Sequence, residues 1–185
     1  MTGESRLRGW LRVAGGIDWL SERFARLASW LILASCVVSA GNATVRYLID
    51  RSSNAWLEAQ WYMFAGIVML GAPWVLKVNE HVRVDILYGR LAPRTRAWVD
   101  LLGFLLFLMP ATALFLWMAW PFFLESFTSG EMSNNAGGLP RWWVKVVMPV
   151  GFAMLALQGL AEIVKRIGYL RGLHDMDVEY ERPLQ

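Results

Sequence analysis

Four long apolar stretches constrain this chain more than any other feature of its sequence. Residues 101–124 contain no charged side chain, and residues 27–45 form a second run of nineteen uncharged residues. A helix needs about 20 mainly apolar residues to cross a bilayer. Because 56% of the residues are hydrophobic and only 18% are charged, little of the chain is left for a soluble domain. The sequence therefore predicts an all-α membrane protein with four transmembrane helices.

The predicted spans lie within a single membrane domain, residues 1–185, and cover residues 27–49, 54–78, 97–124 and 141–165. Pro110 is a candidate kink in the third span. Residues 6–26 place apolar side chains at helical spacing beside several arginines, which is typical of an amphipathic helix at the membrane surface. Gly15-Gly16 is a candidate break in it, and a fluid basic tail is the alternative. Residues 172–185 form a polar tail.

The distribution of basic residues predicts how the chain is oriented. Fourteen of the eighteen Lys and Arg residues fall at the two chain ends or between the second and third spans. The remaining four are Arg46, Arg51, Arg141 and Lys145. Because cytoplasmic loops carry the excess of basic residues, both termini and the segment around His81 should be cytoplasmic. The basic residues flank apolar runs instead of clustering on a soluble face, so we expect no nucleic-acid partner.

Few residues are suited to catalysis or to holding a cofactor. Cys36 is the only cysteine, and neither histidine, His81 or His174, lies in a predicted span. This excludes an internal disulfide, a four-cysteine metal site and a bis-histidine haem in the bundle. The spans carry few ionisable groups and no convincing internal repeat, unlike a self-sufficient secondary transporter. We therefore predict no enzyme activity and no catalytic, cofactor-binding or metal-ligating residues.

Glu58, about one turn into the second span, is the exception among the apolar helices. Negative charge is favoured near a helix amino terminus. Glu58 therefore either anchors the helix at the interface, or pairs with Arg46, or makes a polar contact to another membrane subunit.

Two connecting segments are amphipathic or aromatic. Residues 79–96 mix charges with apolar residues and end at Pro93, as expected for a second helix lying at the cytoplasmic interface. Such a helix is either a connector or a brace for a neighbouring protein. His81 and Asp85 share a face at i, i+4, and we interpret them as solvated or headgroup-facing rather than as metal ligands. The outer segment 125–141 is either an ordinary loop or a landing surface for a soluble partner.

Several motifs resemble those of one transporter family. The chain is similar to the small membrane subunit, the DctQ-like component, of tripartite ATP-independent periplasmic (TRAP) transporters. The similarity rests on the four-span layout and on four motifs: residues 57–62 (LEAQWY), 79–85 (NEHVRVD), 126–131 (SFTSGE) and 137–142 (GGLPRW). The amino-acid sequences of these motifs most resemble those of the branch labelled mannitol/chloroaromatic transport. The candidate partner-interface residues are Glu58, Trp61, His81, Arg83, Asp85, Arg141 and Trp142.

This resemblance implies a scaffold subunit of a sodium-coupled importer of an organic acid, in a bacterial inner membrane. It implies two protein partners besides the membrane lipids: a large elevator-type permease subunit, whose static part the small subunit stabilises and widens, and a periplasmic substrate-binding protein. Sodium coupling belongs to the permease in that family, so no cofactor is expected here. The alternatives are an independent oligomeric carrier and a membrane adaptor without a transport role.

Overall fold

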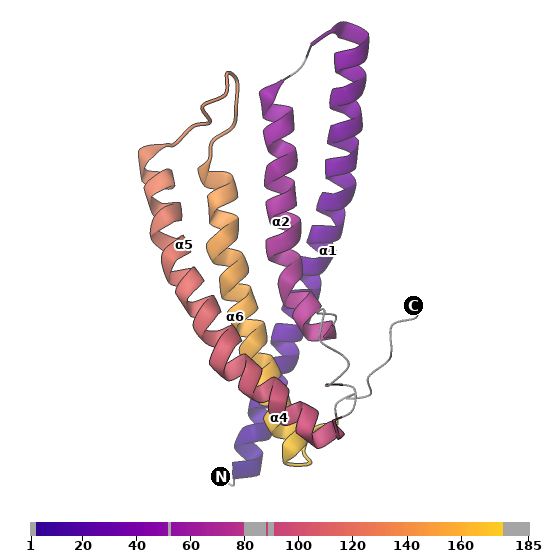
Figure 1. The fold of residues 1–185 in the computed structure, drawn as a ribbon, viewed down its shortest axis with the longest axis vertical. Coiled ribbons are helices and arrows are strands. Elements are labelled where there is room, and N and C mark those ends of the chain that lie inside the picture. Colours follow the sequence, from indigo (N-terminus) through magenta and orange to yellow (C-terminus); the bar gives the residue numbers. More distant parts are fainter. Residues whose placement is uncertain (1–2, 52, 80–87, 89–90, 176–185) are drawn as a thin grey trace.

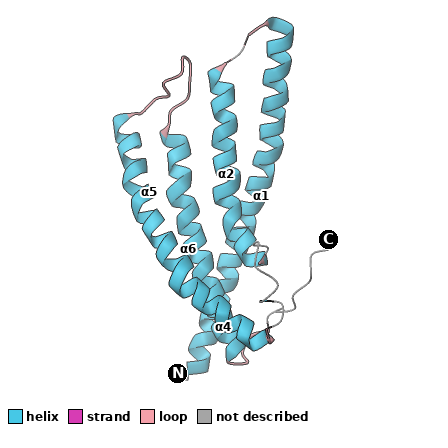
Figure 2. Ribbon diagram, viewed as in Figure 1, coloured by secondary structure: helices cyan, strands magenta, loops and turns pink. Residues whose placement is uncertain are grey.

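The computed structural model describes residues 3–51, 53–79, 88 and 91–175. Within this part of the chain the regular structure is helical, without a β-strand, and the loops lie at the helix ends (Figure 2). The helices are α1 (Gly3–Ile49), α2 (Asn54–Val78), α4 (Pro93–Gly103), η1 (Phe104–Leu108), α5 (Met109–Ser129) and α6 (Trp142–Leu170). Because α4, η1 and α5 form one continuous helix, four helices are long and apolar enough to cross a membrane. The predicted all-α, four-span fold is confirmed.

The helices alternate in direction, so the bundle has two distinct ends (Figure 1). The loop end carries the connection from α1 to α2 and the loop from α5 to α6. The terminal end carries the start of α1, all of α4 and the end of α6. The amino terminus and the end of the last helix therefore share one end of the bundle. The second predicted amphipathic segment lies mainly in residues 80–87 and 89–90, outside the described residues.

α1 is a single helix of 47 residues. The candidate break at Gly15-Gly16 is not present, because both glycines are helical. At 1.5 Å per residue the helix is about 70 Å long, whereas a hydrocarbon core is about 30 Å thick. Residues 6–26 and the apolar residues 27–45 thus belong to one helix. A glycine within a helix costs only about 1 kcal/mol, which packing against neighbouring helices can offset.

A narrow seam holds α1 against the bundle. Its buried residues recur at every seventh position: Leu7, Ala14, Ser21, Ala28 and Ser35. A seven-residue repeat keeps one face of a long helix directed at its neighbours. Since most of these side chains are small, the helices approach each other closely. Other positions of α1, including Trp19, Trp30 and Val37, are exposed and suit lipid or another protein.

α2 packs between α1 and α6, and glycines mark the closest approaches. A Cβ atom on Gly66 would lie 2.8 Å from the Leu31 Cδ1 atom of α1. A Cβ atom on Gly151 of α6 would lie 2.7 Å from the Met69 Cβ atom and 2.9 Å from its carbonyl oxygen. A larger residue at Gly151 would meet the backbone of Met69, whereas at Gly66 it would meet only the end of the Leu31 side chain.

The third long helix changes its hydrogen-bonding pattern just before Pro110. Residues Phe104–Leu108 form a π-helical segment, and the N–H of Met109 donates to the carbonyl of Phe104, five residues earlier. Proline cannot donate to the preceding turn and crowds it. A π-segment is one of the recognised ways in which a helix accommodates such a position. The helix begins at Pro93, four residues before the predicted start of the span, and runs alongside α6 toward the loop end (Figure 1).

Candidate functional site

The Glu58 carboxylate is the centre of a polar cluster at the loop end. Glu58 is a charged residue in an apolar helix, and it is only 2% exposed. It accepts hydrogen bonds from the Ser133 hydroxyl, from the Asn135 Nδ2 atom at 2.7 Å and from the Leu139 backbone N–H at 2.7 Å. All three donors come from the loop between α5 and α6. The loop is therefore wrapped around a single carboxylate on α2.

Gly138 allows the loop to come this close. A Cβ atom at Gly138 would lie 2.8 Å from the Glu58 Oε2 atom and would also collide with the Ser133 side chain. Asn54, the first residue of α2, adds a further tie by donating to the Ala136 carbonyl at 2.9 Å. We call residues 130–141 the loop cap, because they close the loop end over α2.

The loop cap is also bonded to itself and to α6. The Ser133 N–H donates to the Leu139 carbonyl at 3.1 Å, and the Arg141 N–H donates to the Glu131 carbonyl at 2.9 Å. The Lys145 ammonium donates to the Glu131 carboxylate. That contact is the main reason why the pKa of Glu131 lies below its ordinary value of 4.5. Residues 125–141 were predicted as either an ordinary loop or a landing surface for a soluble partner. In the structure, hydrogen bonds and an ion pair hold the loop cap in this segment in a defined conformation.

The predicted site residues are only partly brought together. Arg141 is the last residue of the loop cap that binds Glu58, and the ring of the adjacent Trp142 packs edge-on against Phe127 of α5 with centroids 5.3 Å apart. Trp61, by contrast, is 61% exposed on the outside of α2. His81, Arg83 and Asp85 lie outside the described residues.

Within the described part of the chain, Glu58 binds the loop cap, which is not one of the three roles expected from the sequence. Among the described residues, Arg46 forms no ion pair with it and instead lines a groove with Leu57 and Gln60. A contact between Glu58 and another subunit stays a prediction.

A second polar cluster lies at the terminal end, and sequence reasoning missed it. Gln158 of α6 is fully buried. Its Oε1 atom accepts from the Ser21 hydroxyl at 2.7 Å, and its Nε2 atom donates to Asp18 at 2.8 Å and to Glu162 at 3.0 Å. One amide therefore joins α6 to two residues of α1.

Ion pairs extend this cluster to α4. Lys165 pairs with Asp18 at 3.1 Å and with Glu162. Arg166 pairs with Glu162 and, at 3.3 Å, with Asp100 of α4, and its guanidinium lies 4.6 Å from the centre of the Phe104 ring. We call these residues the terminal-end cluster: Asp18, Ser21, Asp100, Gln158, Glu162, Lys165 and Arg166. Three carboxylates and two cations are thereby held among three helices.

A sequence signal for this cluster does exist. Gln158, Glu162 and Arg166 follow one another at four-residue intervals and so share one face of α6. Polar residues on one face of an otherwise apolar span usually point into the bundle.

The charged side chains of both clusters are engaged in contacts within the chain. Among the described residues, no group of three or more His, Cys, Asp or Glu side chains is placed to hold a metal ion. The three buried charged side chains in this part of the chain, Glu58, Glu162 and Arg166, are each paired within the chain. The chemistry that the two clusters perform is structural: they fix a loop and lock three helices together.

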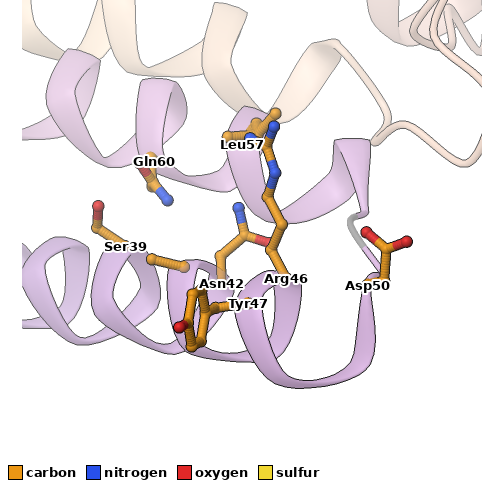
Figure 3. A pocket seen from close by; sticks show the side chains of 8 residues that line it. Ser39, Asn42, Arg46, Tyr47, Asp50, Leu57 and Gln60 are labelled. Carbon is orange, nitrogen blue, oxygen red and sulfur yellow. The ribbon is translucent and has the colours of Figure 1, made fainter.

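A third polar feature is an open groove between α1 and α2 near the loop end (Figure 3). Its volume is about 560 Å³. It is lined by Ser39, Asn42, Ala43, Arg46, Tyr47, Asp50, Leu57 and Gln60. Unlike the two clusters, this α1–α2 groove is not closed by other parts of the described chain.

Comparison with known proteins identifies a family. The family model described as "Tripartite ATP-independent periplasmic transporters, DctQ component" matches residues 35–168, which is more than half of the chain. The matched range begins within α1 and ends near the end of α6, so it includes the loop cap and most of the terminal-end cluster. Searches of curated proteins and of solved structures found no match.

Proposed function

The chain belongs to the DctQ family, the DctQ component of tripartite ATP-independent periplasmic transporters, and on this premise we propose that it is a scaffold subunit. In this proposal it stabilises and widens the static part of a large elevator-type permease subunit. The permease holds the substrate and sodium sites, and a periplasmic binding protein delivers an organic acid. The chain itself performs no catalysis and binds no cofactor.

The observation that carries this proposal is the pairing of the buried charges. Ionisable residues inside a membrane protein commonly mark a transport pathway. Here Glu58 is occupied by the loop cap, Glu162 is occupied by Arg166 and Lys165, and Arg166 also pairs with Asp100 of α4. Contacts that are already made within the chain favour a rigid block over a moving carrier.

We further propose that the protein lies in a bacterial inner membrane with its terminal end in the cytoplasm. Two observations support this orientation. Fourteen of eighteen Lys and Arg residues are predicted on one side of the membrane. The start of α1, α4 and the end of α6, which carry many of these residues, lie together at the terminal end (Figure 1). The loop cap then faces the periplasm.

Reconstitution tests the proposal. Liposomes would contain the chain alone, the permease alone or both, with the binding protein and a radiolabelled organic acid outside and a sodium gradient imposed. We expect sodium-driven uptake only where the permease is present, and the highest rate with both subunits. Uptake by the chain alone at the rate of the complex would show an independent carrier. Equal uptake with and without the chain would point to an adaptor without a transport role.

A further inference from the structure

We propose that the α1–α2 groove is the surface that receives a membrane-spanning helix of the large permease subunit, with Arg46 facing an acidic or carbonyl group near the outer end of that helix. This inference rests on the proposed function, and it specifies which face of the chain meets the permease.

The first observation is that the groove is polar and unoccupied by the chain's own side chains. Its lining includes Ser39, Asn42, Arg46, Asp50 and Gln60. Among the described residues, none of these five side chains takes part in a hydrogen bond or ion pair, in contrast to the side chains of the loop cap and the terminal-end cluster. Figure 3 shows the Gln60 side chain directed from α2 toward α1, and Arg46 reaching toward Leu57.

The second observation is where the groove lies. From Asp50, just past the end of α1, to Ser39 is eleven residues, or about 16 Å along a helix. Ser39, Asn42 and Ala43 fall within the uncharged stretch 27–45, at a depth that the bilayer reaches. Unsatisfied polar groups in hydrocarbon are costly, so this surface is expected to be covered by protein.

The third observation is the shape of the α1 side of the groove. Asn42, Ala43, Arg46 and Asp50 lie three, four, seven and eleven residues after Ser39, so the five residues share one helix face. Ser39 and Ala43 form a pair of small residues four apart, the spacing at which transmembrane helices approach closely. Asn42 and Gln60 offer both donors and acceptors to a neighbouring helix. The groove extends over three helical turns and is lined by small and amide side chains. This extended shape fits a neighbouring helix better than it fits a compact lipid headgroup.

The fourth observation is charge. Arg46 and Arg51 lie at the loop end, the side that has few basic residues, and neither has an ion-pair partner among the described residues. Lys145 at the same end is neutralised by Glu131. An unpaired guanidinium at the rim of a polar groove is complementary to a carboxylate or to helix-terminal carbonyls, for which its fork of donors is suited.

The opposite side of the bundle has a different character. On α5 the exposed positions include Leu114, Trp117 and Met118, and Phe107 of η1 is 75% exposed. Between residues 102 and 124 no exposed position carries a charged or amide side chain. This apolar face suits lipid tails, so the bundle has a lipid side and a protein side.

Two tryptophan substitutions on the same helix test the proposal. Ser39→Trp fills the groove, whereas Val37→Trp adds the same bulk on the far side of α1, where Val37 is 63% exposed. Arg46→Glu reverses the charge at the rim. Each variant would be expressed with its permease and extracted in a mild detergent, and the permease retained on the tagged small subunit would be measured. The melting temperature of each small subunit alone controls for folding.

We expect Ser39→Trp and Arg46→Glu each to lower retention by about tenfold, and Val37→Trp to retain the permease as the wild type does. Retention unchanged by Ser39→Trp and Arg46→Glu would overturn the proposal. The proposal would also be overturned if the chain formed a homo-oligomer and Ser39→Trp disrupted it, because a second copy of the chain would then occupy the groove. Loss of a bound phospholipid from Arg46→Glu in native mass spectrometry, with the permease retained, would assign the groove to lipid. Failure of the wild type to retain any permease would instead remove the proposed function.

Discussion

Glu58 and Leu139 lie 81 residues apart in the sequence, yet the Leu139 backbone N–H donates to the Glu58 carboxylate at 2.7 Å. A charged side chain on one membrane helix thereby fixes the course of a loop that connects two others. Asn135 and Ser133 bond to the same carboxylate, so three donors of the loop cap share one acceptor. This relationship explains why a carboxylate is tolerated in α2.

Replacing Glu58 by Ala is expected to free the loop cap, because three donors lose their common acceptor at once. Hydrogen exchange of residues 131–139 should rise, and association with the permease should weaken. Glu58→Gln keeps one acceptor oxygen and should have a smaller effect. The matched control is Glu125→Ala, since Glu125 is exposed near the end of α5. Equal exchange and equal association for Glu58→Ala and Glu125→Ala would contradict this ranking.

Acid should loosen the contact between Glu131 and Lys145. The Lys145 ammonium holds the pKa of Glu131 below 4.5, so the folded state binds the proton less readily than the unfolded state. The stabilisation is therefore present above pH 4.5 and is lost as the pH falls through the lowered pKa. Thermal unfolding in detergent between neutral and acidic pH would measure it, with Glu131→Gln as the comparison. An unchanged pH dependence in that variant would exclude Glu131 as the source.

Gly151→Ala should destabilise the bundle by about 1–3 kcal/mol, the usual cost of overpacking. The new methyl group would meet the Met69 Cβ atom at 2.7 Å and the Met69 carbonyl oxygen at 2.9 Å, and a backbone atom cannot rotate away. Gly71→Ala is the control, because a Cβ atom there has nothing within 4 Å. Denaturation in mixed micelles would compare the two variants. Similar stabilities would mean that α2 and α6 are less closely packed than described.

Glu162→Ala should cost about 3 kcal/mol or more, because it leaves Arg166 buried without its nearest carboxylate. Glu162 and Arg166 are 2% and 3% exposed, respectively. The control is Glu22→Ala, which removes an exposed pair with Arg26 on α1 and should have little effect. The double variant Glu162→Leu with Arg166→Leu should recover much of the loss, since both charges are then absent. A double variant as unstable as Glu162→Ala would argue against charge burial as the cause.

Charge reversal at Arg83 or Asp85 should disturb assembly or placement in the bilayer without changing which substrate is transported. This expectation follows from their position in the amphipathic segment predicted at the cytoplasmic interface. Uptake competition among several organic acids, measured in the reconstituted complex, would check it. A changed order of substrate preference would indicate that the segment reaches the substrate pathway.

The all-α fold and the number of helices long enough to span the membrane could be predicted from the sequence. These properties depend on hydrophobicity summed over about 20 residues. That quantity is local, so it does not require knowledge of how the helices pack. The continuity of α1 through Gly15-Gly16 was harder to predict. Two glycines lower the local stability of a helix by a small amount, and the contacts with α2 and α6 that offset this cost cannot be read from the local sequence.

What Glu58 and Gln158 do was decided only by the tertiary structure. The sequence marked Glu58 as unusual but left three roles open, and it gave no reason to connect Gln158 with Asp18, 140 residues earlier. Such contacts depend on the rotation of each helix about its axis and on the relative depth of its neighbours. Hydrophobicity places a helix in the membrane but determines neither quantity. Close packing determines both the rotation and the depth of each helix. It thereby brings polar residues that are far apart in the sequence together in the loop cap and the terminal-end cluster.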